Sequence, residues 1–163
     1  EMKNFMNKDF CKKHEFELDP QKILNGSKKK KIAFETYTHA AHIRLFDIAE
    51  RIPYKRRKGR SIVFIKNELK KYQQHLLKIL EQETPGILDN KNVLSNLKAT
   101  TIEKQKGKLL KTHEDTLDGL TCALVAYLFW RDGRSHWETI GSLPDGCVVI
   151  PRKAAYGRNR KRS

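Results

Sequence analysis

One helix near the C-terminus constrains the fold more than any other feature. Residues 120–130 read LTCALVAYLFW and are apolar at nearly every position, and the acidic stretch THEDTLD at 112–118 leads into them. A helix that is apolar on all sides is normally buried, so the sequence predicts a core helix that starts at Thr112 and ends near Asp132 and Gly133. Asp115 and Asp118 are three residues apart and share one face of that helix. A carboxylate that enters an apolar interior needs a partner, and a divalent metal ion is one.

Both aspartates also have an interpretation without a metal. Thr112 and Asp115 are spaced almost as in a capping box, where a Thr hydroxyl and a carboxylate satisfy the first free amides of a helix. Glu114 fits the same interpretation. Asp118 lies deeper in the predicted helix, where it can pair with one of the many Lys and Arg side chains. Gly119 follows it and would let a backbone or a ligand come close.

The charge balance indicates a polyanionic partner. The chain has 163 residues, enough for one domain with a core, and 34 Lys and Arg against 19 Asp and Glu. Such an excess favours nucleic acid first and an anionic membrane second, while a merely soluble basic protein is the alternative. The run at 54–60 is the main candidate for binding nucleic acid, because an aromatic ring among cations can stack on unpaired bases. Its candidate residues are Tyr54, Lys55, Arg56, Arg57, Lys58 and Arg60. Tyr156 stands in a second basic run at 152–162.

The three cysteines, Cys11, Cys122 and Cys147, are too far apart for a zinc site. An odd, sparse count of cysteines fits a reducing compartment, and no apolar run reaches the roughly 18 residues of a membrane span. On the buried helix, Cys122 would act as a small hydrophobic residue. We therefore expect a cytoplasmic protein that does not enter a membrane.

Local patterns predict few strands. We expect a strand at 32–37, helices at 40–50, 61–83 and 89–106, and a hairpin that joins 137–140 to 147–150. One strand before residue 137 cannot make a sheet, so either the helices pack largely alone or sheet strands are missing from this chain. Glu35 lies on the predicted strand. His39 and His42 fit a packing or surface role better than metal ligation, because two ligands do not make a site.

Five motifs in order carry a family resemblance: ETYTHAA at 35–41, YKRRKGR at 54–60, EDTLDGL at 114–120, ETIG at 138–141 and GCVVIP at 146–151. Together they resemble domain-of-unknown-function family 429, a family of predicted RNase H-like nucleases. The resemblance implies an α/β, RNase H-like fold with a mixed sheet flanked by helices and a C-terminal hairpin. The N-terminal strands of the family, with their Gly-hydrophobic-Asp and Ile-Asp-x-Pro motifs, are missing, so we expect an incomplete domain.

The resemblance also implies a site and an organisation of the chain. Glu35 would be the acidic residue of a late core strand, and Asp115 and Asp118 those of the last helix, so that all three converge on Mg²⁺ or Mn²⁺. The chemistry would be two-metal hydrolysis of nucleic-acid phosphodiester bonds, with neither DNA nor RNA favoured. A non-catalytic nucleic-acid-binding module that uses the basic loops and tail is the alternative function. The expected organisation is an irregular basic segment (1–31), the C-terminal part of an RNase H-like domain (32–151) and a basic disordered tail (152–163).

Overall fold

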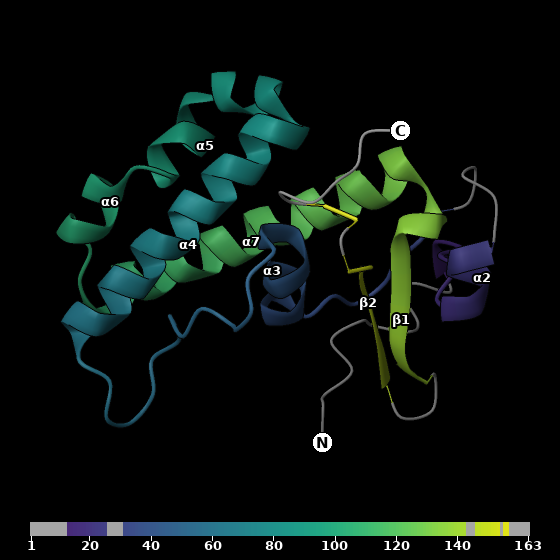
Figure 1. Cartoon of the computed structure of the whole chain (residues 1–163), viewed down its shortest axis with the longest axis horizontal. Helices are drawn as coiled ribbons and strands as arrows, with labels where there is room; N and C mark the ends of the chain where they lie inside the picture. Colours follow the sequence, from purple (N-terminus) through teal and green to yellow (C-terminus); the bar gives the residue numbers. More distant parts are fainter. Residues whose placement is uncertain (1–12, 26–30, 143–145, 154, 157–163) are drawn as a thin grey trace.

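The structure is a computed structural model, and it describes residues 13–25, 31–142, 146–153 and 155–156. Over these residues the fold is mixed α/β, with six α-helices and one antiparallel pair of strands (Figure 1). The α-helices are α2 (Pro20–Asn25), α3 (Thr38–Phe46), α4 (Ile62–Glu83), α5 (Lys91–Asn96), α6 (Ala99–Lys104) and α7 (Gly107–Asp132). The strands are β1 (Trp137–Ser142) and β2 (Gly146–Pro151), and 3-10 turns occupy Pro85–Asp89 and Arg134–His136.

Helix α4 confirms the helix predicted over 61–83. The Ser61 hydroxyl accepts a hydrogen bond from the Phe64 amide at 3.1 Å and so satisfies one of the free amides of the first turn. Pro85 begins a 3-10 turn directly after the helix. The apolar stripe faces the core, apart from Ile62, which is exposed. Its buried members are Ile65, Leu69, Tyr72, Leu76, Ile79 and Leu80.

Helix α7 differs from its prediction at its start and in its surroundings. It begins at Gly107, five residues before the predicted start, because residues 108–111 continue the helix and Leu110 packs in the core. Thr112 and Asp115 therefore lie inside the helix, and the capping-box interpretation is wrong. The prediction of a helix buried on all sides is also wrong. One face of α7 is exposed at Cys122, Ala123, Ala126, Tyr127 and Trp130.

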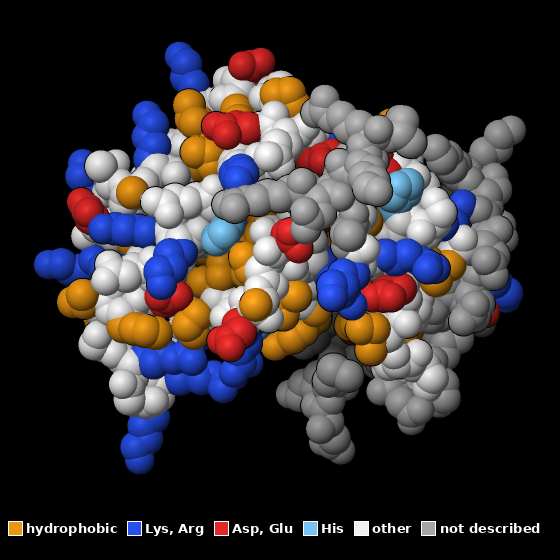
Figure 2. Space-filling model, in the orientation of Figure 1, with side chains coloured by type: hydrophobic (Ala, Val, Ile, Leu, Met, Phe, Trp, Pro, Cys, Tyr) orange, Lys and Arg blue, Asp and Glu red, His pale blue; other side chains and the backbone are white. Residues whose placement is uncertain are grey.

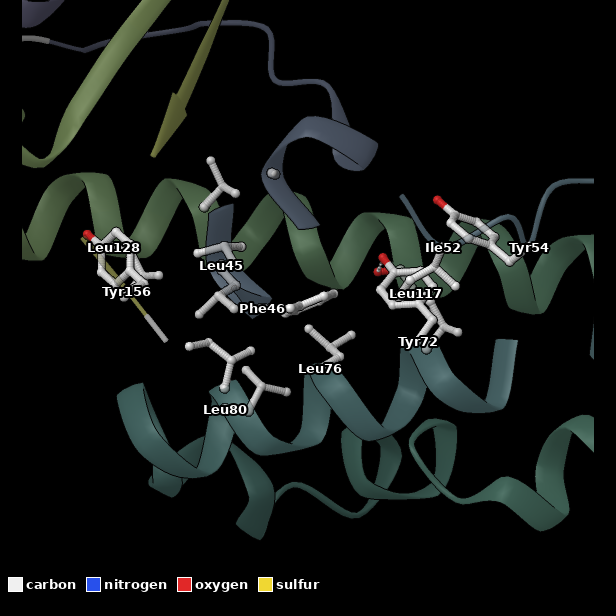
Figure 3. Close-up of a cluster of buried hydrophobic side chains, with 14 of the residues drawn as sticks. Leu45, Phe46, Ile52, Tyr54, Tyr72, Leu76, Leu80, Leu117, Leu128 and Tyr156 are labelled. Atoms are coloured by element: carbon white, nitrogen blue, oxygen red, sulfur yellow. Dashed lines mark hydrogen bonds between the residues drawn. The ribbon is translucent and has the colours of Figure 1, made fainter. Parts of the chain in front are cut away.

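The core lies where α3 and α4 pack against α7. Helices α4 and α7 run in the same direction, since Tyr72 of α4 bonds to the Leu117 carbonyl and Glu83 bonds to Arg131 further along both helices. Figure 3 shows side chains of all three helices meeting between them. Both long helices therefore begin at the same end of the molecule (Figure 1).

The predicted hairpin is confirmed, with Trp137 opposite Pro151 and Ser142 opposite Gly146. The predicted strand at 32–37 is wrong. Its backbone contacts include one isolated parallel bridge between Glu17 and Ile32 and one hydrogen bond from the Val149 amide to the Glu35 carbonyl at 2.8 Å. Two single contacts to different segments do not make the continuous ladder of a strand, so the segment is extended but lies outside the sheet.

The remaining predictions are met in part. The helix expected at 40–50 is α3, which ends at Phe46 because Asp47 adopts a left-handed conformation, φ 52°. The helix expected at 89–106 forms as the two short helices α5 and α6. Residues 13–25 of the segment predicted as irregular include α2, while 1–12 and 26–30 lie outside the described residues. None of the described helices has the length and apolar composition needed to cross a membrane.

The start of the predicted disordered tail is ordered. Arg152 donates from its side chain to the Trp137 carbonyl at 2.9 Å. The Tyr156 ring is fully buried, and its hydroxyl donates to Asp132 at 2.8 Å. The prediction of disorder is therefore wrong for residues 152–153 and 155–156, and residues 157–163 lie outside the described part of the chain.

Candidate functional site

Three neighbouring carboxylates of α7 form one cluster. Glu114, Asp115 and Asp118 each offer an oxygen, and these oxygens all lie within 4.8 Å of one another. The three side chains differ in burial, since Glu114 is buried, Asp118 is half-buried and Asp115 is exposed. They come together because positions i, i+1 and i+4 of a helix lie on adjoining parts of its surface. The cluster therefore runs from the core to solvent.

Two lysines neutralise the carboxylate cluster. The Lys55 ammonium lies 2.5 Å from Asp118 Oδ2 and 3.0 Å from Glu114 Oε1. Lys111 lies 2.7 Å from both Glu114 Oε1 and Asp115 Oδ1. Burial opposes the charged form of Lys55, but its hydrogen bonds with Asp118 and Glu114 outweigh burial and raise its pKa. Hydrogen bonds with Asp115 and then Glu114 raise the pKa of Lys111 as well.

Buried hydroxyl groups fix the position of Asp118. The Tyr54 hydroxyl donates to Asp118 Oδ1 at 2.6 Å. The Tyr72 hydroxyl donates to the Leu117 carbonyl at 2.9 Å and lies 2.5 Å from the Thr121 hydroxyl. Burial, followed by the hydrogen bond to Asp118, raises the pKa of Tyr54, so the phenol stays protonated as a donor. The interpretation of Asp118 as a carboxylate paired with a lysine is confirmed.

The structure does not bring Glu35 into the carboxylate cluster. Its backbone carbonyl bonds to Val149 of β2, and the charge of its carboxylate contributes to a raised pKa of Cys147, after burial. The expected convergence of Glu35 with Asp115 and Asp118 is therefore absent from the described residues. The physical reason is that the segment around Glu35 lies along the hairpin instead of entering a sheet beside α7.

The basic loop at 54–60 splits into inward and outward residues. Tyr54 is fully buried, so the prediction that it stacks on bases is wrong. Lys55 turns inward to the carboxylate cluster. Arg60 donates to the carbonyls of Pro53 and Lys55, both at 2.9 Å, and so closes the loop. The three cations between them, at 56–58, are exposed, and their side chains make no hydrogen bond or ion pair within the described residues.

His39 and His42 of α3 lie in the core, against the rings of Tyr54 and Tyr72. The His42 ring is fully buried, stacks on Phe46 with ring centroids 5.0 Å apart and lies 4.2 Å from the Tyr72 ring. A packing role for both histidines is therefore confirmed. Neither nitrogen of His42 has a hydrogen-bond partner among the described residues, and burial lowers its pKa to about 3. At neutral pH the ring is uncharged.

Sequence reasoning missed the role of two residues here, Lys111 beside the carboxylate cluster and Glu114 within it. No predicted motif includes Lys111, although its spacing of three and four residues from Glu114 and Asp115 is that of helical ion pairs. Glu114 was interpreted only as a capping residue. Cys122 is exposed instead of buried, so its predicted role as a small core residue is wrong.

The carboxylate cluster offers oxygens of the kind that bind divalent metal ions. Three anionic oxygens close together are the hard ligands that Mg²⁺ and Mn²⁺ prefer. The cluster already attracts two ammonium groups, and Lys111 is exposed enough to move aside for an ion. Together the three oxygens could hold one divalent ion, and acidic groups of this kind are also common without one.

Comparisons with protein-family models, with curated proteins and with solved structures each find no match. The resemblance to family 429 thus stays a prediction. Any function proposed for this chain depends on the geometry and charge of its own residues.

Proposed function

We propose that this chain binds nucleic acid at one end, which we call the basic end. It consists of residues 55–71, in the loop and the first turns of α4, and residues 103–118, in α6, the connection and the first turns of α7. These two segments carry twelve Lys and Arg against five Asp and Glu. They are adjacent because Lys66 of α4 donates to the Glu103 carbonyl at 2.8 Å and Lys55 pairs with Glu114. This concentration of positive charge is the observation that carries the proposal.

The free cations of the basic end support contacts with phosphates. Residues 56–58, together with Lys104, Lys106 and Lys108, are exposed, and within the described residues their side chains have no ion pair. Figure 2 shows Lys and Arg side chains gathered at this end of the molecule. Helices α4 and α7 also begin here, and the positive ends of their dipoles favour an anion. Phosphate contacts of this kind give affinity that does not depend on base sequence.

The salt dependence of binding tests this proposal. Affinity for labelled oligonucleotides should fall steeply with salt, because each contact releases bound counterions. Replacing Arg56, Arg57 and Lys58 together with Gln should reduce the slope of log K against log salt by about two. The control replaces Lys78, Lys91 and Lys153, which are equally exposed outside the basic end, and should leave the slope unchanged. A shallow slope in the unmodified protein would exclude the proposal.

A second candidate function is the metal-dependent nuclease that the family resemblance implies, on an RNase H-like fold. The observation that favours it is the carboxylate cluster within the basic end, where a phosphodiester backbone would pass close to it. Glu114, Asp115 and Asp118 would hold Mg²⁺ or Mn²⁺, which lowers the pKa of a bound water and polarises the phosphate. The Tyr54 hydroxyl would orient Asp118, and the cations at 56–58 would hold the strand.

Titration with Mn²⁺ tests the nuclease. Asp118→Asn keeps an oxygen for the Tyr54 hydroxyl but removes a ligand charge, so Mn²⁺ binding and nucleic-acid cleavage should both be lost. Asp89→Asn changes an exposed carboxylate elsewhere and should change neither. A folded chain that binds Mn²⁺ equally well with and without Asp118 would exclude this cluster as a metal site. Binding of nucleic acid without any metal requirement would favour the first function alone.

A further inference from the structure

The basic end also exposes large apolar side chains. Ile62, Val63 and Phe64, in the first turn of α4, are 44%, 69% and 40% exposed, and Leu109, in the first turn of α7, is 64% exposed. We call these four side chains the apolar patch. They lie at one end because α4 and α7 are parallel and start together. Apolar side chains gathered at a functional end of a molecule commonly mark a site of interaction.

Cations surround the apolar patch. Along the chain, residues 56–58 precede the α4 part of the patch, and Lys104, Lys106 and Lys108 precede Leu109. The Arg60 guanidinium lies over the Phe64 ring, 5.8 Å from its centroid. Figure 2 shows orange side chains among blue ones at this end. The surface thus offers positive charge and apolar area over the same few residues.

We propose that the basic end binds single-stranded nucleic acid in preference to a duplex, with unpaired bases packed against the apolar patch. This inference rests on the proposed nucleic-acid binding. A single strand presents phosphates and base faces together, and these match the two kinds of surface side by side on the protein. Proteins hold single strands without reading their sequence by combining a cationic surface with aromatic side chains on which bases stack, and Phe64 is the aromatic member of the apolar patch.

A duplex fits the apolar patch poorly. Its bases are stacked inside the helix, and its outside is the charged sugar-phosphate backbone. Docking a duplex on the basic end would press Val63 and Leu109 against phosphates, which removes water from those phosphates without a compensating contact. A single strand would instead cover the same side chains with base faces.

The test compares a 20-nucleotide oligothymidylate, an oligouridylate of the same length and a 20-base-pair duplex at one salt concentration. Fluorescence anisotropy should give at least about tenfold tighter binding of the single strands, from contacts with one or two bases. The variant Val63→Ser with Leu109→Ser should lose most of that preference. It should leave the salt slope unchanged, because the apolar contribution involves no counterions. The control, Ile87→Ser with Ile140→Ser, alters exposed apolar residues elsewhere and should bind like the unmodified protein.

Each outcome separates this inference from the proposed function. Equal or tighter binding of the duplex, or an unchanged preference in the Val63 and Leu109 variant, overturns the inference and leaves nucleic-acid binding in place. If none of the three probes binds, both the inference and the proposed function are overturned. Binding to phosphatidylserine vesicles that requires Val63 and Leu109, with no binding of nucleic acid, also overturns both and assigns the basic end to an anionic lipid surface.

Discussion

A fully buried histidine makes the stability of this fold depend on pH. His42 packs among Phe46, Tyr54 and Tyr72, and neither of its ring nitrogens has a partner within the described residues. Burial lowers the pKa of His42 from 6.5 to about 3, and the positive charges of His39 and its other basic neighbours add to the effect. Protonation of this ring in the folded protein would place an unpaired charge in the aromatic core.

The sign of the effect follows from the two pKa values. Below pH 6.5 the unfolded chain binds a proton at His42, whereas the folded chain binds one only near pH 3. Unfolding is therefore favoured as pH falls, and the loss of stability levels off near the lower value. Between neutral pH and pH 4.5 the loss amounts to about 3 kcal/mol, since each pH unit below 6.5 contributes about 1.4 kcal/mol. A typical domain has only about 5–15 kcal/mol in total.

Urea unfolding at pH 7.5 and 4.5 measures this loss, with His42→Phe as the reference. Phenylalanine keeps an aromatic ring against Phe46 but cannot bind a proton, and any packing strain it adds is the same at both pH values. Other groups titrate alike in the two proteins and cancel. The stability of the unmodified protein relative to the variant should fall by about 3 kcal/mol between the two pH values. If the stability difference between the unmodified protein and the variant is the same at both pH values, His42 is not a neutral buried ring.

Four other perturbations test local features. Tyr54→Phe removes the hydroxyl that donates a hydrogen bond to Asp118. The free energy of unfolding, measured with denaturant, should fall by about 1.5–3 kcal/mol, the usual range for a hydrogen bond to a charged group. Gly141→Ala should lower the melting temperature, because its φ is +95° and a Cβ there meets a carbonyl of the facing strand. Gly119→Ala should instead raise the melting temperature and add up to about 1 kcal/mol of stability, because alanine favours a helix more than glycine does and nothing lies within 4 Å of the added Cβ. Lys111→Met should tighten Mn²⁺ binding several-fold in calorimetry, because the ammonium competes for the same oxygens.

The parts of the fold that the sequence predicts well have local causes. Helix α4 carries its own start in Ser61, its own stop in Pro85 and an apolar stripe with helical spacing between them. The hairpin carries a turn sequence between two β-branched runs. In both elements each residue's preference agrees with the final structure, so single-sequence patterns are enough.

The parts that the sequence does not predict depend on distant partners. Whether residues 32–37 form a strand depends on which segments lie beside them, and among the described residues those segments supply one isolated bridge at Glu17 and one hydrogen bond from Val149. Tyr54 lies in a run of cations, which is typical of a solvated loop, yet its ring is buried because Asp118 and the α3 histidines meet it from other parts of the chain. The carboxylate cluster has a local cause, because helical spacing brings Glu114, Asp115 and Asp118 together. Its partner Lys55 comes from a distant part of the sequence and reaches the cluster only through the fold.

In the basic loop, one short run of sequence contributes to stability and would also serve the proposed binding. Tyr54 and Lys55 attach the start of the loop to Asp118, and Arg60 bonds the end of the loop back to the carbonyls of Pro53 and Lys55. These contacts fix the backbone on both sides of residues 56–58 without using any of those three side chains. A loop held in this way loses less conformational entropy when it meets a ligand than a free basic segment would, and this favours binding. In the proposed nucleic-acid binding, the inward-facing lysine and arginine would therefore contribute to affinity indirectly, by holding the outward-facing cations in place, and not by contacting phosphate.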